Sequence, residues 1–390
     1  MVQKDNFTGQ ILSVAKRVYA SKDVDEDIRL YLLRNDFLPT CGDSRILQVE
    51  INTISAGFAG IMESLSQIHA SNRIMYYPRL EGELPENKPC FAFASAMAEA
   101  VKAHNEKWGR ASRLVVFVVE SGERNIIDQY AIERYLGRDF GLTVVRRTLE
   151  QIYRAGTLSE DRFLLLHGLE VALVYFRSGY DPKHYGSISS LEWKARELIE
   201  ISKTVKCPTL LAQLAGTKKV QQLWFSNKGS VLSRFGLNPT EIDRLFQVFA
   251  VQTDPSRDAT SRMQAVNDPD SWVLKPQREG GGNNLYGQEL KEALSGSLDP
   301  TDLAQFVLME RMNPVPRPAL VLDSPLTEQC GTVVPLLLEE AVSELGLFSI
   351  YLPHSQNNSV CGHLLRTKDK SVREGGVNAG FAFLDTAALF

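Results

Sequence analysis

The chain has 390 residues, of which 44% are hydrophobic and 23% are charged, a composition that predicts two or three packed domains with a sizeable core. Its 43 basic and 47 acidic residues nearly cancel to a net charge of -4, which gives no indication of nucleic acid or an anionic membrane as a partner. The five cysteines are scattered without a Cys-x-x-Cys pair and no apolar run reaches the roughly 18 residues of a membrane span, so we expect a cytoplasmic protein without structural zinc.

The N-terminal part of the chain predicts a helix followed by two strands. Apolar residues recur at helical spacing over 7–19, and β-type runs follow at 28–33 and 46–54. In the second run apolar and polar residues alternate, which places Glu50 and Asn52 on the same face. Two neighbouring oxygen ligands suit Mg²⁺ bound jointly by protein and phosphate. A solvated strand face is the alternative, and polar alternation alone favours it.

The middle of the chain predicts a parallel sheet. An all-apolar strand at 114–119, a helix at 126–136 and a β run at 142–145 form a βαβ unit. A third strand at 171–176 and a helix at 191–204 continue the pattern. We therefore expect an α/β domain in this region.

The C-terminal part contains fewer regular patterns. An irregular stretch is expected at 239–269. A strand at 306–310 follows, then a crossover interrupted by prolines, and finally paired β runs near the C-terminus. The end of this strand, at 309–312, offers an edge for an adenine ring, although an ordinary core strand explains its apolar residues equally well. In a strand at 362–368, Arg366 and Lys368 lie on one face. Two cations without an intervening acid repel each other, so a bound anion is the simpler explanation.

The run Lys275-Pro-Gln-Arg-Glu-Gly-Gly-Gly-Asn-Asn284, here named the glycine-rich loop, has the residues of a nucleotide-phosphate site. Consecutive glycines let backbone N–H groups approach an anion, Lys275 and Arg278 supply positive charge, and Glu279 can hold a cation. The run is neither a Walker A loop nor a dinucleotide fingerprint. It predicts metal-assisted phosphoryl transfer, and a mobile surface loop is the alternative. Lys218, at the start of a predicted helix, can reach a phosphate or be an ordinary solvated lysine.

A second group of polar residues follows the ends of the predicted parallel strands. Glu123, Arg124 and Asn125 come just after the first strand, where open α/β sheets bind ligands. Arg124 can grip a carboxylate in a bidentate fork, while Asn125 can equally be a helix N-cap. Arg177 and Tyr180 repeat the arrangement after the third strand. The sequence shows no credible nucleophile triad, because the histidines are dispersed and no G-x-S-x-G elbow is present.

Taken together, these motifs resemble eukaryotic glutathione synthetase, a family of the ATP-grasp superfamily. The resemblance spans nearly the whole chain and rests on separated motifs in the expected order, at 48–56, 123–129, 174–180, 213–222, 275–286, 343–346, 362–368 and 375–377. It implies a mixed α/β ATP-grasp fold with an inserted parallel α/β substrate-binding domain and a glycine-rich lid. The implied division is 1–110 and 217–390 for the ATP-grasp body and 111–216 for the inserted domain.

The resemblance implies ATP-dependent ligation of γ-glutamylcysteine to glycine through an acyl phosphate, with Mg²⁺ as cofactor and a homodimer as the assembly. Family members carry a substantial N-terminal segment before the point where this chain begins, so a non-catalytic ATP- or peptide-binding relative is one alternative. Glu374 and Asn378 depart from the common lid pattern, so a ligase for another acceptor, such as β-alanine, is the other.

By resemblance, site residues are implied for each ligand. The metal ligands are Glu50, Asn52 and Glu279. The ATP-binding residues are Lys218, Lys275, Gln277, Glu279, Gly280, Gly281, Gly282, Asn283, Asn284, Tyr286, Met309, Glu310, Arg311, Met312, Glu344, Lys368 and Glu374. The residues that bind the dipeptide or glycine are Arg34, Ile54, Ser55, Ala56, Gly57, Glu123, Arg124, Asn125, Gln129, Arg177, Ser178, Gly179, Tyr180, Arg366, Val377 and Asn378. Arg34, Arg366 and Lys218 are expected to act at the acyl transfer.

Overall fold

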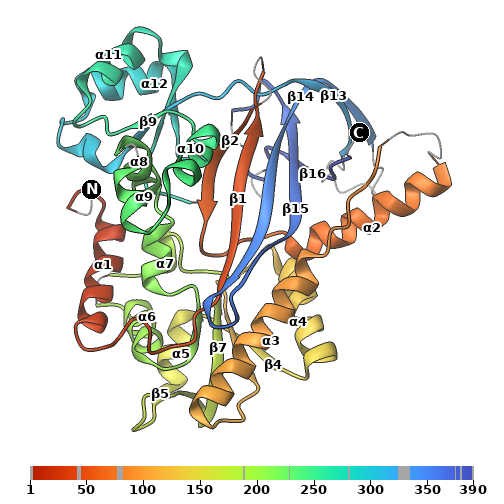
Figure 1. Cartoon of the computed structure of the whole chain (residues 1–390), viewed down its shortest axis with the longest axis vertical. Helices are drawn as coiled ribbons and strands as arrows, with labels where there is room; N and C mark the ends of the chain where they lie inside the picture. The colour runs from red at the N-terminus through yellow and green to blue at the C-terminus, as the bar shows by residue number, and fades with distance from the viewer. Residues whose placement is uncertain are drawn as a thin grey trace.

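The computed structural model contains three sheets with helices around them (Figure 1). It describes residues 3–41, 45–76, 82–187, 189–227, 229–279, 282–323, 334–373, 375–377 and 380–388. The mixed α/β architecture confirms the predicted fold class. Among the described residues, no helix is both long and apolar enough to cross a membrane.

An antiparallel sheet joins the N-terminal strands to the C-terminal ones. Its order is β16-β15-β14-β1-β2, and β13 also pairs with β14. The strands are β1 Tyr31–Pro39, β2 Ile46–Asn52, β13 Arg317–Asp323, β14 Val334–Leu352, β15 Asn357–Asp369 and β16 Phe383–Asp385. In Figure 1, β1, β14 and β15 run side by side, so polar residues far apart in the sequence meet on one sheet.

The second sheet has a parallel centre, in the order β4-β3-β7, with β8 also paired to β7. Its strands are β3 Leu114–Val118, β4 Thr143–Arg147, β5 Gly156–Leu158, β6 Leu164–Leu166, β7 Leu169–Phe176 and β8 Val205–Cys207. Strand β3 is apolar throughout because both faces are covered: Val115 and Phe117 enter one core, Val116 and Val118 another.

Helices on both faces of the parallel sheet supply these two cores, and Leu210 of α7 Leu210–Ala215 also enters the second one. On one face lie α2 Ala59–Tyr76, α3 Pro89–Trp108 and α4 Ile126–Phe140, and on the other lie α1 Asn6–Tyr19, α5 Leu149–Ala155 and α6 Leu191–Ile201. Phe93 of α3 packs edge-to-face against Phe348 of β14, so this helix layer also joins the parallel sheet to the antiparallel one.

The third sheet is small and antiparallel, in the order β11-β10-β12-β9. Its strands are β9 Gln252–Thr253, β10 Trp272–Lys275, β11 Leu285–Tyr286 and β12 Val307–Glu310, and its neighbouring helices are α11 Ala259–Asn267 and α12 Gly287–Glu292. The pairing of β10 with β11 brings together the two ends of the glycine-rich loop. The chain reaches this sheet through α7 Leu210–Ala215, α8 Lys218–Ser226, α9 Ser230–Arg234 and α10 Pro239–Val248.

Two sequence-based predictions of secondary structure were wrong. The stretch 239–269 is not irregular, because it contains α10 and α11. Helix α10 starts with a capping box in which Asn238 and Glu241 satisfy each other's backbone N–H groups, a signal present in the sequence. The strand expected at 28–33 begins only at Tyr31 and continues to Pro39. Helices α2 and α3 were not predicted at all.

Candidate active site

A cavity of about 730 Å³ lies where the three sheets approach one another, and it collects most of the predicted site residues. Those that line it are Arg34, Glu50, Asn52, Ile54, Ser55, Gly57, Glu123, Asn125, Arg177, Tyr180, Lys218, Lys275, Glu279, Asn283, Asn284, Tyr286, Met309, Glu310, Arg311, Met312, Glu344, Arg366, Lys368 and Val377. Those that do not line it are Ala56, Arg124, Gln129, Ser178, Gly179, Gln277 and Gly282. Gly280, Gly281, Glu374 and Asn378 lie outside the described residues.

Two carboxylates and one lysine form the centre of the cavity. The Lys218 Nζ, at the start of α8, lies 3.1 Å from Glu50 Oε2 and 3.3 Å from Glu279 Oε1. Burial opposes ionisation of Glu50, but the positive charges of Lys218 and Lys275 outweigh it and lower the pKa of Glu50 to about 2. Burial raises the pKa of Glu279 to about 7, and the negative charge of Glu50 adds to this against the pull of Lys218. The two glutamates therefore lie on either side of the positive charge of Lys218.

The donor set fits the magnesium ion implied by the sequence. Carboxylate and amide oxygens are the hard ligands that Mg²⁺ takes, and Glu50, Glu279 and Asn52 supply them. The Asn52 side-chain N–H group donates to Asp36 Oδ2 at 3.0 Å, which leaves its carbonyl oxygen as the atom for a cation. The described part of the chain contains no group of three or more His, Cys, Asp or Glu side chains placed to hold a metal. The site proposed here has only two carboxylates, and its third protein ligand is the Asn52 amide.

The buried Asp36 of β1 organises this centre and was missed by the sequence analysis. Its carboxylate accepts a bidentate pair from Arg34, at 2.7 and 2.8 Å, and a third bond from Arg366 Nη2 at 3.0 Å. Glu344 of β14 accepts a further bond from Arg366. A bound anion, inferred from the sequence because no acid intervenes between Arg366 and Lys368, is not needed to neutralise Arg366, since Asp36 and Glu344 reach it from other strands of the sheet. A Cβ at Gly346 would lie 2.8 Å from Asp36 Oδ1, so only glycine leaves room for this carboxylate.

A second buried carboxylate, Asp128 of α4, organises the other end of the cavity. It accepts hydrogen bonds from the backbone N–H groups of Phe58 and Gly60, at 2.9 and 2.7 Å, at the start of α2. Its Oδ2 also lies 3.3 Å from Arg177 Nη2 at the carboxyl end of β7. The buried Nε of Arg177 has no hydrogen-bond partner. Asp128 thus fixes both a backbone segment and an arginine that face the cavity.

The predicted residues after β3 divide into two roles. Glu123 lines the cavity, and Gln129 lies behind it, donating to Glu123 Oε2 at 2.6 Å while accepting from Arg146 Nη2 at 2.5 Å. Arg124 is exposed and does not line the cavity. Asn125 occupies the N-cap position of α4 but makes no side-chain capping bond, and instead donates to Asp128 at 3.4 Å.

The end of the cavity beside the glycine-rich loop combines cations with an apolar surface. Lys275 lies beside a cluster that contains Val273 and Met309, with Tyr286 and Met312 packed against it. Such a surface suits a flat base, and lysines suit its phosphates.

Two residues of the glycine-rich loop have different partners from those expected. Arg278 Nη1 donates at 2.7 Å to Asp5, the N-cap of α1, so its charge is paired within the protein. Gln277 accepts from the backbone N–H of Lys219 at 3.1 Å and donates to the carbonyl of Gln305 at 3.1 Å. Both side chains fasten the loop to neighbouring elements.

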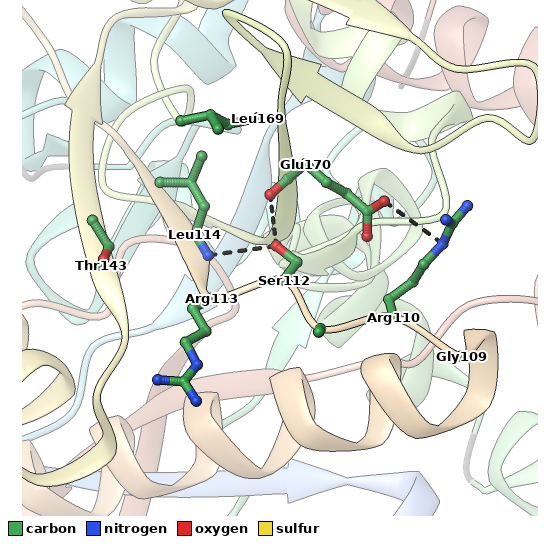
Figure 2. A pocket seen from close by; sticks show the side chains of 9 residues that line it. Gly109, Arg110, Ser112, Arg113, Leu114, Thr143, Leu169 and Glu170 are labelled. Carbon is green, nitrogen blue, oxygen red and sulfur yellow. Dashed lines mark hydrogen bonds and ion pairs between the residues drawn. The ribbon is translucent and has the colours of Figure 1, made fainter.

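A second hollow, of about 510 Å³, lies at the amino ends of the parallel strands (Figure 2). Two of its polar groups interact with Glu170: Ser112 Oγ donates to the carbonyl of Glu170 at 2.6 Å, and Arg110 Nε forms an ion pair with the Glu170 carboxylate at 3.6 Å. None of the predicted site residues lines it. The cavity at the carboxyl ends of β3 and β7 is the position where open α/β sheets bind ligands.

Comparisons with known proteins identify the family of the chain. The family model described as "Eukaryotic glutathione synthase, ATP binding domain" matches residues 1–389. The glutathione synthetase of Macaca fascicularis is 37% identical over 98% of this chain and 79% of its own length, and that of Homo sapiens is 36% identical over the same shares. A chloroplastic glutathione synthetase of Solanum lycopersicum is 36% identical over 99% of this chain and 68% of its own length.

A solved structure supports the fold. The apo form of a glutathione synthetase-like effector from Globodera pallida superposes with a TM-score of 0.69 at 17% identity, covering 100% of this chain and 83% of that one. The family match over nearly the whole sequence and the identity to curated relatives lead to one conclusion. The chain belongs to the eukaryotic glutathione synthase family.

Proposed function

We propose that this chain is an ATP-dependent ligase that joins γ-glutamylcysteine to glycine and releases glutathione, ADP and phosphate. The observation that carries the proposal is the single cavity that holds both implied sets of residues. Arg177, Asn125 and Glu123 line one end, and Lys275 and Tyr286 line the other. The buried charges between the two ends lie where phosphoryl transfer between a carboxylate and a nucleotide would occur.

In the proposed reaction a cysteinyl carboxylate oxygen attacks the γ-phosphorus of ATP. The bond from that phosphorus to the ADP oxygen breaks, and an acyl phosphate forms. Arg34 and Arg366, both held by Asp36, are placed to orient the carboxylate and to balance its charge. Mg²⁺, held by Glu50, Asn52 and Glu279, would neutralise phosphate charge when bound.

The second step forms the peptide bond. The glycine amine attacks the acyl carbon, phosphate leaves with the electron pair of the broken C–O bond, and the amine proton passes to solvent. No enzyme nucleophile is needed, in keeping with a sequence that shows no nucleophile triad. The remaining work for the protein is positioning and electrostatic stabilisation.

Three further features stay proposals. The homodimer is supported by the resemblance to the family. The division at 111 and 216 is supported by the strands of the parallel sheet, which all fall between these limits. A cytoplasmic location is a prediction from the sequence, and one relative is named chloroplastic.

The test is ADP release by the purified chain with ATP, γ-glutamylcysteine and Mg²⁺, with and without glycine, and with the product mass determined. We expect glycine-dependent ADP release and a product with the mass of glutathione. Parallel reactions with β-alanine and serine measure acceptor choice. Binding of ATP without turnover under all conditions would overturn the proposal and favour a non-catalytic relative.

A further inference from the structure

The turn after β7 carries two cavity-lining residues, Arg177 and Tyr180, and is followed by a short 3₁₀ helix, Pro182–His184. Gly179 within the turn has φ = 97°, a conformation that side-chain-bearing residues rarely adopt. Glycine adopts this conformation without strain, so the position of the turn depends on the contacts that hold it from outside.

His184 supplies much of that support. Its Nδ1 accepts the backbone N–H groups of Gly179 at 3.1 Å and of Asp181 at 3.2 Å, on the two sides of Tyr180. Its Nε2 lies 3.1 Å from Glu120 Oε2, and its ring packs edge-on against the Tyr180 ring with centroids 4.6 Å apart. The side chain is only 2% exposed.

These contacts define the protonation state of the ring. A nitrogen that accepts two N–H groups carries no proton, so the neutral imidazole has its hydrogen on Nε2 and donates it to Glu120. A proton on Nδ1 would face two N–H donors and would break both bonds.

We propose that His184 is a positioning residue whose neutral imidazole holds the turn that presents Arg177 and Tyr180 to the dipeptide, and that protonation of Nδ1 releases this turn. The identity of the ligand rests on the proposed function. The arrangement of the turn and the tautomer of the ring do not.

The charges around the ring act in both directions. Burial lowers the pKa of His184 below its ordinary value, and the carboxylates of Glu120 and Asp181 oppose this, while Lys183 adds to it. Beyond Tyr180 the charged neighbours are Arg177 and Glu123. The ring is therefore neutral at neutral pH, and the support it gives is complete above the ordinary histidine pKa and is lost as the pH falls through the lowered value.

The test compares the wild type with His184→Gln and His184→Leu. A glutamine oxygen can accept both N–H groups and its amide can donate to Glu120, but glutamine does not titrate. For the wild type, the Kd of γ-glutamylcysteine should rise by about tenfold for each pH unit below the pKa of His184, because the binding-competent fraction falls in proportion. His184→Gln should bind as the wild type does at pH 7.5 and lack this acid rise. His184→Leu should bind weakly at every pH.

The same comparison separates His184 from the rest of the site. Glu279 also titrates, but its contribution is common to the wild type and the glutamine variant. The KM for the dipeptide should carry the effect of His184→Leu, while the KM for ATP stays unchanged. Equal pH slopes for the wild type and His184→Gln would overturn the proposal.

A second readout does not depend on the reaction. In ¹⁵N-histidine NMR spectra of the ligand-free wild type, the signal that disappears in His184→Gln should report the Nε2–H tautomer at pH 7.5. An Nδ1–H tautomer would contradict the proposal even if the enzyme turns over. Absence of dipeptide binding in the wild type at pH 7.5, with the expected tautomer present, would instead count against the proposed function and leave the structural role of His184 supported.

Discussion

At the scale of residues, the site depends on buried carboxylates that were not recognised from the sequence. Strand alternation places Arg34 and Asp36 on one face of β1, and the concentration of charge near Glu50 and Glu279 was also visible. The sequence did not show which acid neutralises which base, because Asp36 and Arg366 come from strands separated by most of the chain. Such pairing depends on sheet register, and local patterns do not contain it.

The role of Asp36 leads to a first prediction. Asp36→Asn keeps the shape of the side chain but leaves Arg34 and Arg366 without their shared negative charge. We expect turnover to fall by about a hundredfold or more, on the scale of losing one fixed electrostatic contact, and the melting temperature to fall with it. Asp139→Asn is the control, since that carboxylate is exposed and pairs with its neighbour Arg138 at the surface. Turnover within about threefold of the wild type would contradict the role of Asp36.

The two cavity glutamates provide a second prediction. Glu279→Gln removes a charge next to Lys218 and from the proposed metal site, whereas Glu123→Gln changes a side chain held by Gln129 at the other end. Two unit charges about 4 Å apart interact by roughly 4 kcal/mol at an effective dielectric near 20, so charge at the metal site should dominate. Steady-state assays of both purified variants should show a far larger loss for Glu279→Gln. Similar losses would remove Glu279 from the metal site.

At the scale of elements, the helices and strands whose apolar residues repeat at a clear spacing were predicted, and several without such a repeat were missed. Helix α1 and the βαβ unit from β3 to β4 were predicted because their apolar residues repeat at clear spacings. Helix α3 was missed because it is buried against two layers and its apolar residues surround most of its surface. Helix α10 has a capping signal in its sequence, but none of its residues is fully buried. The helix was missed because this signal was not used.

The contact between α2 and α4 allows a third prediction. A Cβ at Gly60 would lie 2.6 Å from the Ala131 Cβ and 2.7 Å from the Asp128 carbonyl oxygen, so Gly60→Ala must force the two helices apart. We expect a loss of roughly 1–3 kcal/mol in the free energy of unfolding and a raised KM for the dipeptide, because Asp128 also holds Arg177.

A matched control lies on α4 itself. At Gly137 the nearest atom to an added Cβ is the Leu142 carbonyl oxygen, at 3.8 Å. Gly137→Ala should therefore stabilise the protein by about 0.5–1 kcal/mol, since alanine restricts the unfolded chain without a clash. Urea unfolding of both variants measures the difference. Equal effects in the two variants would show that the α2–α4 contact tolerates expansion.

At the scale of the whole molecule, function depends on bringing distant segments together. The antiparallel sheet places β1 and β2 beside β14 and β15, and the hairpin of β10 and β11 directs the glycine-rich loop towards them. The family resemblance anticipated this assembly, but the composition and periodicity of the chain did not. The sequence indicated the segments that carry the site residues, and the fold determined which of these residues line the cavity.

This assembly predicts that a nucleotide with its metal stabilises the whole chain. Ligand at about a hundred times its Kd contributes roughly 2.7 kcal/mol to the free energy of unfolding, which for a chain of this size raises the melting temperature by about 3 °C. We expect this shift with ATP and Mg²⁺ together and a much smaller one with ATP and EDTA, measured by calorimetry. Glu279→Gln should lose the dependence on Mg²⁺.

The control for this shift is Arg113→Ala, which alters the second hollow at the far end of β3 and should respond to ATP and Mg²⁺ as the wild type does (Figure 2). A shift of equal size with and without Mg²⁺ would mean that the nucleotide binds without the carboxylate pair. Loss of the shift in Arg113→Ala would mean that the nucleotide binds in the second hollow and not in the cavity between the three sheets. Stabilisation that needs the metal and Glu279 but not Arg113 would assign ATP to the cavity between the three sheets, because that is where the lysines, the carboxylate pair and the apolar surface around Met309 meet.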